Sequence, residues 1–259
     1  MVRGLYSAWT GMQNEQKRLD VIANNLANSA TVGYKKEGVT SQAFDDELAI
    51  KIRDASVDWR REGIGTMSPG VKIGEVYTDY RGGSLRQTGN TFDFAIDGDG
   101  FFAVEYTNRD GVKSTQYTRA GQFTVTNEGY VVDMDGNHVL ANGGYLQVPV
   151  DAGAISVDIS GNVYADNEYV DTITLTDFED YSYLKKFGET RYYPVNGARE
   201  KEAAGLIRQH YTEQSNVNVV TEMVNMITIT RAYEAGQKVI QSIDGTLEQA
   251  ANTIGRVSG

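Results

Sequence analysis

The sequence predicts a mainly β protein with α-helical termini, in which an antiparallel sandwich or barrel-like β domain lies between two helices that form a coiled-coil domain. Apolar residues repeat at helical spacing near both ends of the 259-residue chain, and short alternating segments between glycine turns fill its middle. No helix-length periodic segment separates those strands, which argues against a doubly wound α/β fold. The chain therefore divides into an N-terminal coiled-coil helix (1–34), an extended connector (35–82), a central β domain (83–200) and a C-terminal coiled-coil helix (201–259).

The N-terminal helix is predicted from a heptad repeat. Its seam positions are seven residues apart: Leu5, Met12, Leu19 and Leu26. The repeat stops before Gly33, in a run of short polar side chains that suits a helix exit. Asparagines are unfavourable inside a helix but bind backbone groups at its end. We therefore expect Asn24, Asn25 and Asn28 to fix the junction between this helix and the connector, with contact to a neighbouring subunit as the alternative.

A second helix is predicted from Val219 to Ile254. Spacings of three and four residues alternate along its seam, and Met223 lies in the turn before the seam begins. The seam residues are Met226, Ile229, Tyr233, Gly236, Ile240, Ile243, Leu247, Ala250 and Ile254. Glu222 lies in the first turn, where the helix dipole favours a carboxylate. At 1.5 Å per residue this helix is roughly 50 Å long, which is longer than most helices of globular proteins.

Strands are predicted in the middle of the chain, where turn signals such as Asp99-Gly100 and Glu128-Gly129 recur at roughly ten-residue intervals. The connector fits neither pattern. Residues 43–53 are compatible with a short helix, and the glycine-rich residues 62–74 are expected to be extended.

Composition excludes several classes of partner and chemistry. The chain has 24 Lys and Arg against 35 Asp and Glu, a net charge of −11, so nucleic acid and anionic membrane surfaces are poor partners. No apolar run reaches the ~20 residues that span a bilayer, and the polar residues after the N-terminal methionine do not fit a cleaved signal peptide. The absence of cysteine excludes disulfides, thiolate catalysis and most structural zinc sites.

No motif predicts a catalytic, cofactor-binding or metal site, so we expect neither an enzyme nor a small-molecule substrate. Residues 133–137 are similar to a calcium loop, but His138 and Gly144 stand where that loop needs its glycine and its final glutamate. Aromatic residues on strands pack more often in a core than in a carbohydrate groove. The tyrosines for which both roles are open are Tyr77, Tyr80, Tyr181, Tyr183, Tyr192 and Tyr193.

The two apolar seams predict packing between subunits. The first helix is shorter than the second, and Val220, Val224 and Ile227 lie off the seam of the second, so one partner helix cannot cover it. We therefore predict a subunit interface built from the seam residues of both helices and the three asparagines. The alternative is that both helices lie on the β domain as ordinary core elements.

Three segments carry motifs in a fixed order. Residues 23–35 read ANNLANSATVGYK, residues 88–102 contain TGNTFDFAI and GDGFF and are continued by YTRAGQF at 117–123, and residues 215–234 contain SNVN, EMV, MI and RAYE. Together they closely resemble the bacterial flagellar rod and hook proteins, the axial family, over nearly the whole chain. Thr91 departs from the proline usual in that family, and the apolar pattern around it is kept.

The resemblance implies a structural subunit of the flagellar basal-body rod, of proximal or distal type, which polymerises through its terminal helices into the torque-transmitting drive shaft. The implied partners are further copies of the chain, other rod and hook axial proteins and the flagellar export apparatus. The implied location is the basal body in the cell envelope or periplasm, reached by flagellar type III export without a cleaved signal peptide. Two alternatives stay open: an envelope or extracellular glycan-binding β-domain module that uses the tyrosines, and a hydrolase with an unrecognised carboxylate pair.

Overall fold

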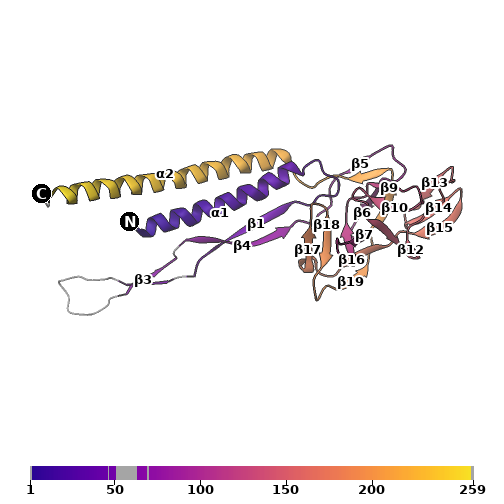
Figure 1. Ribbon diagram of the computed structural model, residues 1–259, viewed down its shortest axis with the longest axis horizontal. Coiled ribbons are helices and arrows are strands. Elements are labelled where there is room, and N and C mark those ends of the chain that lie inside the picture. The colour runs from indigo at the N-terminus through magenta and orange to yellow at the C-terminus, as the bar shows by residue number, and fades with distance from the viewer. Residues whose placement is uncertain (1, 46, 51–62, 69, 258–259) are drawn as a thin grey trace. The chain divides into compact units, whose positions relative to one another are not determined.

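The structure is a computed structural model, and the part that it describes is residues 2–45, 47–50, 63–68 and 70–257. In this part the chain has one α-helix at each end and antiparallel strands between them, as Figure 1 shows. The predicted mainly β fold with helical termini is thereby confirmed. No helix of the described part is long and apolar enough to cross a membrane.

The chain forms two compact units. The helical unit consists of Met1–Leu26, Glu37–Thr78 and Val219–Gly259. The β unit consists of Ala27–Lys36 and Asp79–Asn218. The chain therefore passes between the units more than once, through the segments around residues 27–36, 79 and 218.

The helical unit is built around α1 (Val2–Ala27) and α2 (Val219–Val257), which lie side by side in Figure 1. The first helix ends directly before the polar run that predicted its exit. The second has 39 residues against 26 in the first, so at 1.5 Å per residue their lengths are about 58 and 39 Å.

The contacts between the two helices are antiparallel. A Cβ atom placed on Gly4 would lie 3.6 Å from Ile243 Cδ1, and one placed on Gly236 would lie 2.8 Å from Met12 Cγ. As residue numbers increase along α1, the numbers of the neighbouring residues on α2 therefore decrease. Gly236 allows a close approach, because a larger side chain there would displace Met12.

The C-terminal helix begins at Val219, as predicted. Residues 201–218, which the division of the sequence placed in the same segment, are not part of it. They contribute three strands instead: β19 (Glu200–Glu202), β20 (Leu206–Gln209) and β21 (Tyr211–Glu213). In β20, Ile207 is buried between the exposed Leu206 and Arg208, the two-residue period of a strand. The helical period starts only after these strands.

The connector contains two antiparallel strand pairs, β1 with β4 and β2 with β3. The strand that occupies residues 47–50 corrects the short helix considered for 43–53, of which residues 51–53 lie outside the described part. The pair β1–β4 lies along α1, where Ser41 Oγ donates to Asn14 Oδ1 at 3.1 Å. The four strands are β1 (Glu37–Ala43), β2 (Glu47–Ile50), β3 (Gly63–Met67) and β4 (Val71–Thr78).

The β unit holds the remaining strands, and every pairing described is antiparallel. The largest sheet has the order β17, β18, β8, β7, β11, β10, β9, with β12 beside β11, β16 beside β7 and β19 beside β16. A smaller sheet contains β13, β14 and β15, while β20 pairs with β6 and β21 with β5. The strands not yet given are β5 (Leu85–Gln87), β6 (Phe94–Asp97), β7 (Phe101–Thr107), β8 (Lys113–Thr118), β9 (Phe123–Val125), β10 (Val131–Asp133), β11 (His138–Ala141), β12 (Gly144–Tyr145), β13 (Ile155–Val157), β14 (Asn162–Ala165), β15 (Glu168–Thr172), β16 (Leu175–Phe178), β17 (Leu184–Phe187) and β18 (Arg191–Pro194).

Strand β7 is buried on both faces and lies between two apolar clusters. Phe102 and Val104 belong to one cluster, and Phe101 and Ala103 belong to the other. Successive side chains of a strand point to opposite faces of the sheet. One continuous apolar segment therefore supplies both cores of the β unit.

Phe102→Ala is expected to lower the free energy of unfolding by about 3–5 kcal/mol, because it empties a fully buried site beside the Phe123 ring. The matched control is Val112→Ala in an exposed turn, with an expected change below about 0.5 kcal/mol. Urea unfolding of the purified chain measures both. Equal midpoints for the two variants would contradict the two-core description.

Candidate functional site

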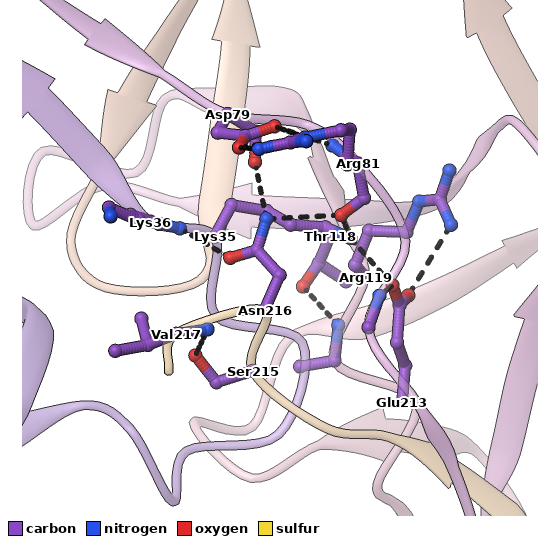
Figure 2. A network of polar contacts seen from close by, with 12 residues as sticks. Lys35, Lys36, Asp79, Arg81, Thr118, Arg119, Glu213, Ser215, Asn216 and Val217 are labelled. Atoms are coloured by element: carbon purple, nitrogen blue, oxygen red, sulfur yellow. Dashed lines mark hydrogen bonds and ion pairs between the residues drawn. The ribbon is translucent and has the colours of Figure 1, made fainter. Parts of the chain in front are cut away.

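Three segments that connect the β unit to the helical unit meet at one place in the β unit. Figure 2 shows residues 35–36, 79–81 and 213–217 around a network of polar contacts, together with the turn after β8. These segments lead, respectively, into β1, away from β4 and into α2. We call this place the strand junction.

The centre of the strand junction is the buried carboxylate of Glu213. Its Oε1 accepts hydrogen bonds from Lys35 Nζ at 2.6 Å and from the Gly83 backbone N–H at 2.8 Å, and its Oε2 lies 3.3 Å from Arg119 Nη1. Lys35 Nζ also donates to the Arg81 carbonyl at 2.9 Å. The side chains of Lys35 and Glu213 are each only 1% exposed. One carboxylate therefore ties together four parts of the chain that are far apart in sequence.

The two charged side chains of Lys35 and Glu213 compensate each other in a place that water does not reach. Burial lowers the pKa of the Lys35 ammonium below its ordinary value, and the adjacent Glu213 carboxylate opposes that shift. A buried ion pair adds little over an apolar pair of the same shape, whereas removal of one partner leaves an uncompensated buried charge. Arg119 is also held by a cation–π contact, with its guanidinium 5.2 Å from the centre of the Phe101 ring.

The side-chain amide of Asn216 forms a second tie. Its Oδ1 accepts from the Lys36 backbone N–H at 2.7 Å, and its Nδ2 donates to the carbonyls of Asp79 at 2.8 Å and Arg81 at 3.1 Å. The Asp79 N–H in turn donates to the Lys36 carbonyl at 2.8 Å. The backbone just before β1, just after β4 and just before α2 is thus held by one side chain (Figure 2).

Gly33 allows the first connecting segment to pass against the turn after β8. Its φ is +70°, and a Cβ atom there would overlap the backbone of Ala120. Its N–H donates to the Glu213 carbonyl at 2.8 Å. A left-handed backbone and a close approach both favour glycine, and this position requires both.

The three predicted asparagines lie in different surroundings. Asn25 is fully buried in the helical unit, where its amide donates to the Glu37 carbonyl at 2.8 Å and accepts from the Glu37 N–H at 2.9 Å. Asn28 Nδ2 donates to Glu189 Oε2 at 2.9 Å in the β unit. Asn24 is exposed on α1. Asn25 and Asn28 thus bind within the chain, at and just after the end of the first helix.

Most predicted seam residues are covered within the chain. Leu247 is an exception, since Gly4 near the start of α1 is beside Ile243 and little of α1 remains to cover later turns. Met223 is also exposed, and the side chain of Ile254 lies outside the described residues. The buried or half-buried seam residues are Leu5, Met12, Leu19, Leu26, Met226, Ile229, Tyr233, Ile240 and Ile243.

Large apolar residues off the seam stay exposed after the two helices have paired. On α2, the exposed fractions are 71% for Val220, 57% for Val224 and 54% for Ile227. On α1, Tyr6 and Trp9 are each 47% exposed. The helical unit therefore presents apolar surface that its own chain does not cover.

The six predicted tyrosines divide between a buried aromatic cluster and the protein surface. Tyr80, Tyr181 and Tyr192 pack around Phe101, with Tyr80 and Tyr192 ring centres 5.3 Å apart, and Tyr192 is fully buried. Within the described ranges, no group of three or more His, Asp or Glu side chains could hold a metal ion. Tyr77, Tyr183 and Tyr193 are exposed at the surface instead, so the carbohydrate-groove alternative stays a prediction for these three residues.

Sequence reasoning did not find Lys35, Arg119 and Glu213 as a group. Lys35 and Arg119 stood in two of the quoted motifs and Asn216 in a third, but spacing along the chain cannot show that they meet. The sequence did contain one signal for this site. Gly33 and Lys35 lie in a family motif just after the first helix, and such residues indicate a position with a specific backbone or charge requirement.

Lys35→Met is expected to lower the free energy of unfolding by about 3–5 kcal/mol, because it leaves Glu213 short of a buried partner. Lys185→Met removes an exposed lysine from β17, so its effect should stay within about 0.5 kcal/mol. Chemical denaturation of both variants measures the difference. A loss no larger than that of the control would show that the junction does not depend on this ion pair.

Gly33→Ala and Gly111→Ala form a matched pair, since both glycines have positive φ, +70° and +78°, but only Gly33 has backbone against its Cβ position. We expect a cost of about 1 kcal/mol at Gly111 from the left-handed backbone alone. At Gly33 a further loss of about 1–3 kcal/mol is expected from overpacking. Thermal unfolding distinguishes them, and equal losses would mean that the close approach to Ala120 is unimportant.

Three family models match this chain. Residues 5–35 match "Flagella basal body rod protein", residues 95–165 match "Flagellar hook protein FlgE/F/G D1 domain", and residues 208–253 match "Flagellar basal body rod FlgEFG protein C-terminal". The motifs quoted from the sequence lie largely within these ranges.

Relatives match over nearly their entire length. The flagellar basal-body rod protein FlgG of Bacillus subtilis (strain 168) is 35% identical over 97% of this chain and 99% of its own length. FlgG of Agrobacterium fabrum is 35% identical over 94% and 96%, and the rod protein FlgF of Mesorhizobium japonicum is 30% identical over 100% of both chains. The resemblance noted from the motifs is confirmed: this chain belongs to the family of flagellar basal-body rod proteins, which are structural proteins and not enzymes.

Proposed function

We propose that this chain polymerises through its terminal helices into the torque-transmitting drive shaft of the flagellar rod. Its family supports a structural role in the rod, a location at the flagellar basal body and contact with other flagellar axial proteins. Further copies of the chain are proposed as its neighbours, with the seam residues of both helices and the exposed residues beside them as the interface.

The observation that carries the proposal is the apolar surface left on the paired helices. Val220, Val224 and Ile227 are all more than half exposed although α1 and α2 already pack together. Leu247 and the turns after it extend beyond the start of α1. Soluble monomers rarely expose a contiguous apolar surface of this kind unless it binds a partner.

Magnitudes favour several neighbours over one. Full burial of a large aliphatic side chain contributes about 1.5–3 kcal/mol. Val220, Val224, Ile227 and Leu247 are on average about half exposed, so burying what remains of these four side chains contributes roughly 3–6 kcal/mol. Association costs about 4–15 kcal/mol in lost translational and rotational freedom. One such contact is therefore too weak for stable association, whereas a tube in which each subunit has several neighbours adds these contributions.

Export through the flagellar export apparatus, without a cleaved signal peptide, completes the proposal. A chain without cysteine carries no disulfide that would have to open during passage in an unfolded state. The proposed destination is the periplasmic part of the basal body, where the helices meet their neighbours.

A short epitope inserted after Gly136, a turn glycine with nothing within 4 Å of its Cβ position, tests the function. The tagged chain should restore swimming to cells that lack the protein, and it should be detected in the rod of purified basal bodies by electron microscopy. Swimming cells whose basal bodies lack the tag would refute the proposal.

Leu247→Asp tests the contribution of the terminal helices to assembly. Leu247 is exposed in the single chain, so the substitution should leave its thermal unfolding nearly unchanged while it places a charge in the proposed interface and abolishes incorporation. Gln249→Asp, two residues later on the exposed surface of the same helix, is the control and should incorporate normally. Immunoblots of purified basal bodies measure both, and normal incorporation of Leu247→Asp would contradict assembly through this seam.

A further inference from the structure

Two exposed apolar patches lie on different helices of the helical unit. The aromatic patch consists of Tyr6 and Trp9 on α1, each 47% exposed, with ring centres 5.9 Å apart. The aliphatic patch lies on the first turns of α2, where four residues at spacings of three and four are 48–71% exposed: Val220, Met223, Val224 and Ile227. Residues at such spacings share one face of a helix, so each patch is a continuous surface.

Both patches lie in stretches that are almost free of charge. Residues 4–14 contain no Asp, Glu, Lys or Arg, and residues 219–230 contain only Glu222, which is buried. Charged residues make up 23% of the whole chain. Depletion of charge with enrichment of Trp, Tyr and Met is the composition of the buried centre of a protein interface, and differs from that of a solvated helix face.

The two patches cannot meet within one molecule. Gly4 is beside Ile243 and Met12 is beside Gly236, so Tyr6 and Trp9 are level with the part of α2 near residue 240. The aliphatic patch lies about 16 residues before that point, roughly 25 Å along the helix at 1.5 Å per residue. Within one molecule, therefore, neither patch can cover the other.

We propose that the aromatic patch of one copy packs on the aliphatic patch of a second copy, in a head-to-tail contact between helical units. The occupant is assigned to this chain because the chain itself carries both complementary halves. Trp and Tyr are the residues that most often anchor an interface by filling an apolar surface on the partner. A contact between unlike patches leaves one of each free, so it repeats in an open series. This inference deepens the proposed polymerisation and rests on it.

Disulfide trapping tests the contact directly, since the natural chain has no cysteine and every disulfide must come from introduced residues. Cells would carry Gln13→Cys/Val224→Cys as their only copy, because Gln13 is exposed one turn after Trp9 and its substitution leaves the aromatic patch intact. Basal bodies purified from these cells would be oxidised. A ladder of covalent oligomers of this chain is expected. Each single variant alone should form no ladder, and neither should Lys17→Cys/Lys238→Cys, whose two positions are exposed on the same helices but outside both patches.

The outcomes separate the contact from the function. Incorporation into basal bodies without a ladder would overturn the contact and leave the rod function standing, whereas absence of the unmodified chain from basal bodies would overturn both. A covalent dimer with no larger species would overturn the head-to-tail geometry. A disulfide from Val224→Cys to a different protein would assign the aliphatic patch to another partner.

A second measurement does not depend on disulfide geometry. Trp9→Ala should reduce incorporation roughly thirtyfold, the loss typical of a central aromatic anchor, and Lys17→Ala should not. Because Trp9 is about half exposed in the single chain, the purified variant should still unfold cooperatively, with a midpoint only a few degrees lower than that of the unmodified protein. Unchanged incorporation of Trp9→Ala would overturn the proposal.

Discussion

The buried carboxylate of Glu213 is the interaction on which the connection of the chain's ends depends. It binds Lys35 before β1, the backbone at Gly83 after β4, and Arg119 in the β unit, while Glu213 itself stands shortly before α2. A carboxylate with buried cationic partners has few alternative arrangements, because each alternative leaves a charge unpaired away from water. The strand junction is therefore well defined even though the chain that forms it comes from both ends and the middle of the sequence.

The strand junction of the β unit and the helix surfaces of the helical unit differ in charge and in exposure to solvent. The strand junction is charged and sealed, with Lys35, Arg119 and Glu213 almost inaccessible to solvent. The helix surfaces are uncharged and open, with apolar side chains such as Val220 and Trp9 about half or more exposed. Buried charges suit an arrangement that must be unique within one molecule, whereas apolar surface suits contacts that form when neighbours arrive, since it has no strict geometry to satisfy beforehand.

The energetics of the exposed helix surfaces favour association with several neighbours at once over association with one. Each exposed patch is too small to hold one partner against the loss of translational and rotational freedom, whereas in the proposed polymer the contributions of several such contacts would add. In that proposed polymer, stiffness would follow from close packing of many side chains, without any reactive group. Family membership and the physical character of the surface agree on a structural role.

The sequence by itself determined the helices, the mainly β centre and the family, because apolar period, turn residues and motifs are local properties of the chain. It predicted the start of the second helix at Val219 but assigned residues 201–218 to the same segment, where the structure has strands. It gave no pairing for the connector, since β1–β4 contacts join residues 28 to 41 positions apart. The exposure of Val220 and Val224 agrees with their predicted place off the seam. Only the tertiary structure decided that the seam is largely covered within the chain and that Lys35 and Arg119 converge on Glu213. The physical reason is that burial and ion pairing depend on distances between parts of the chain that no local spacing encodes.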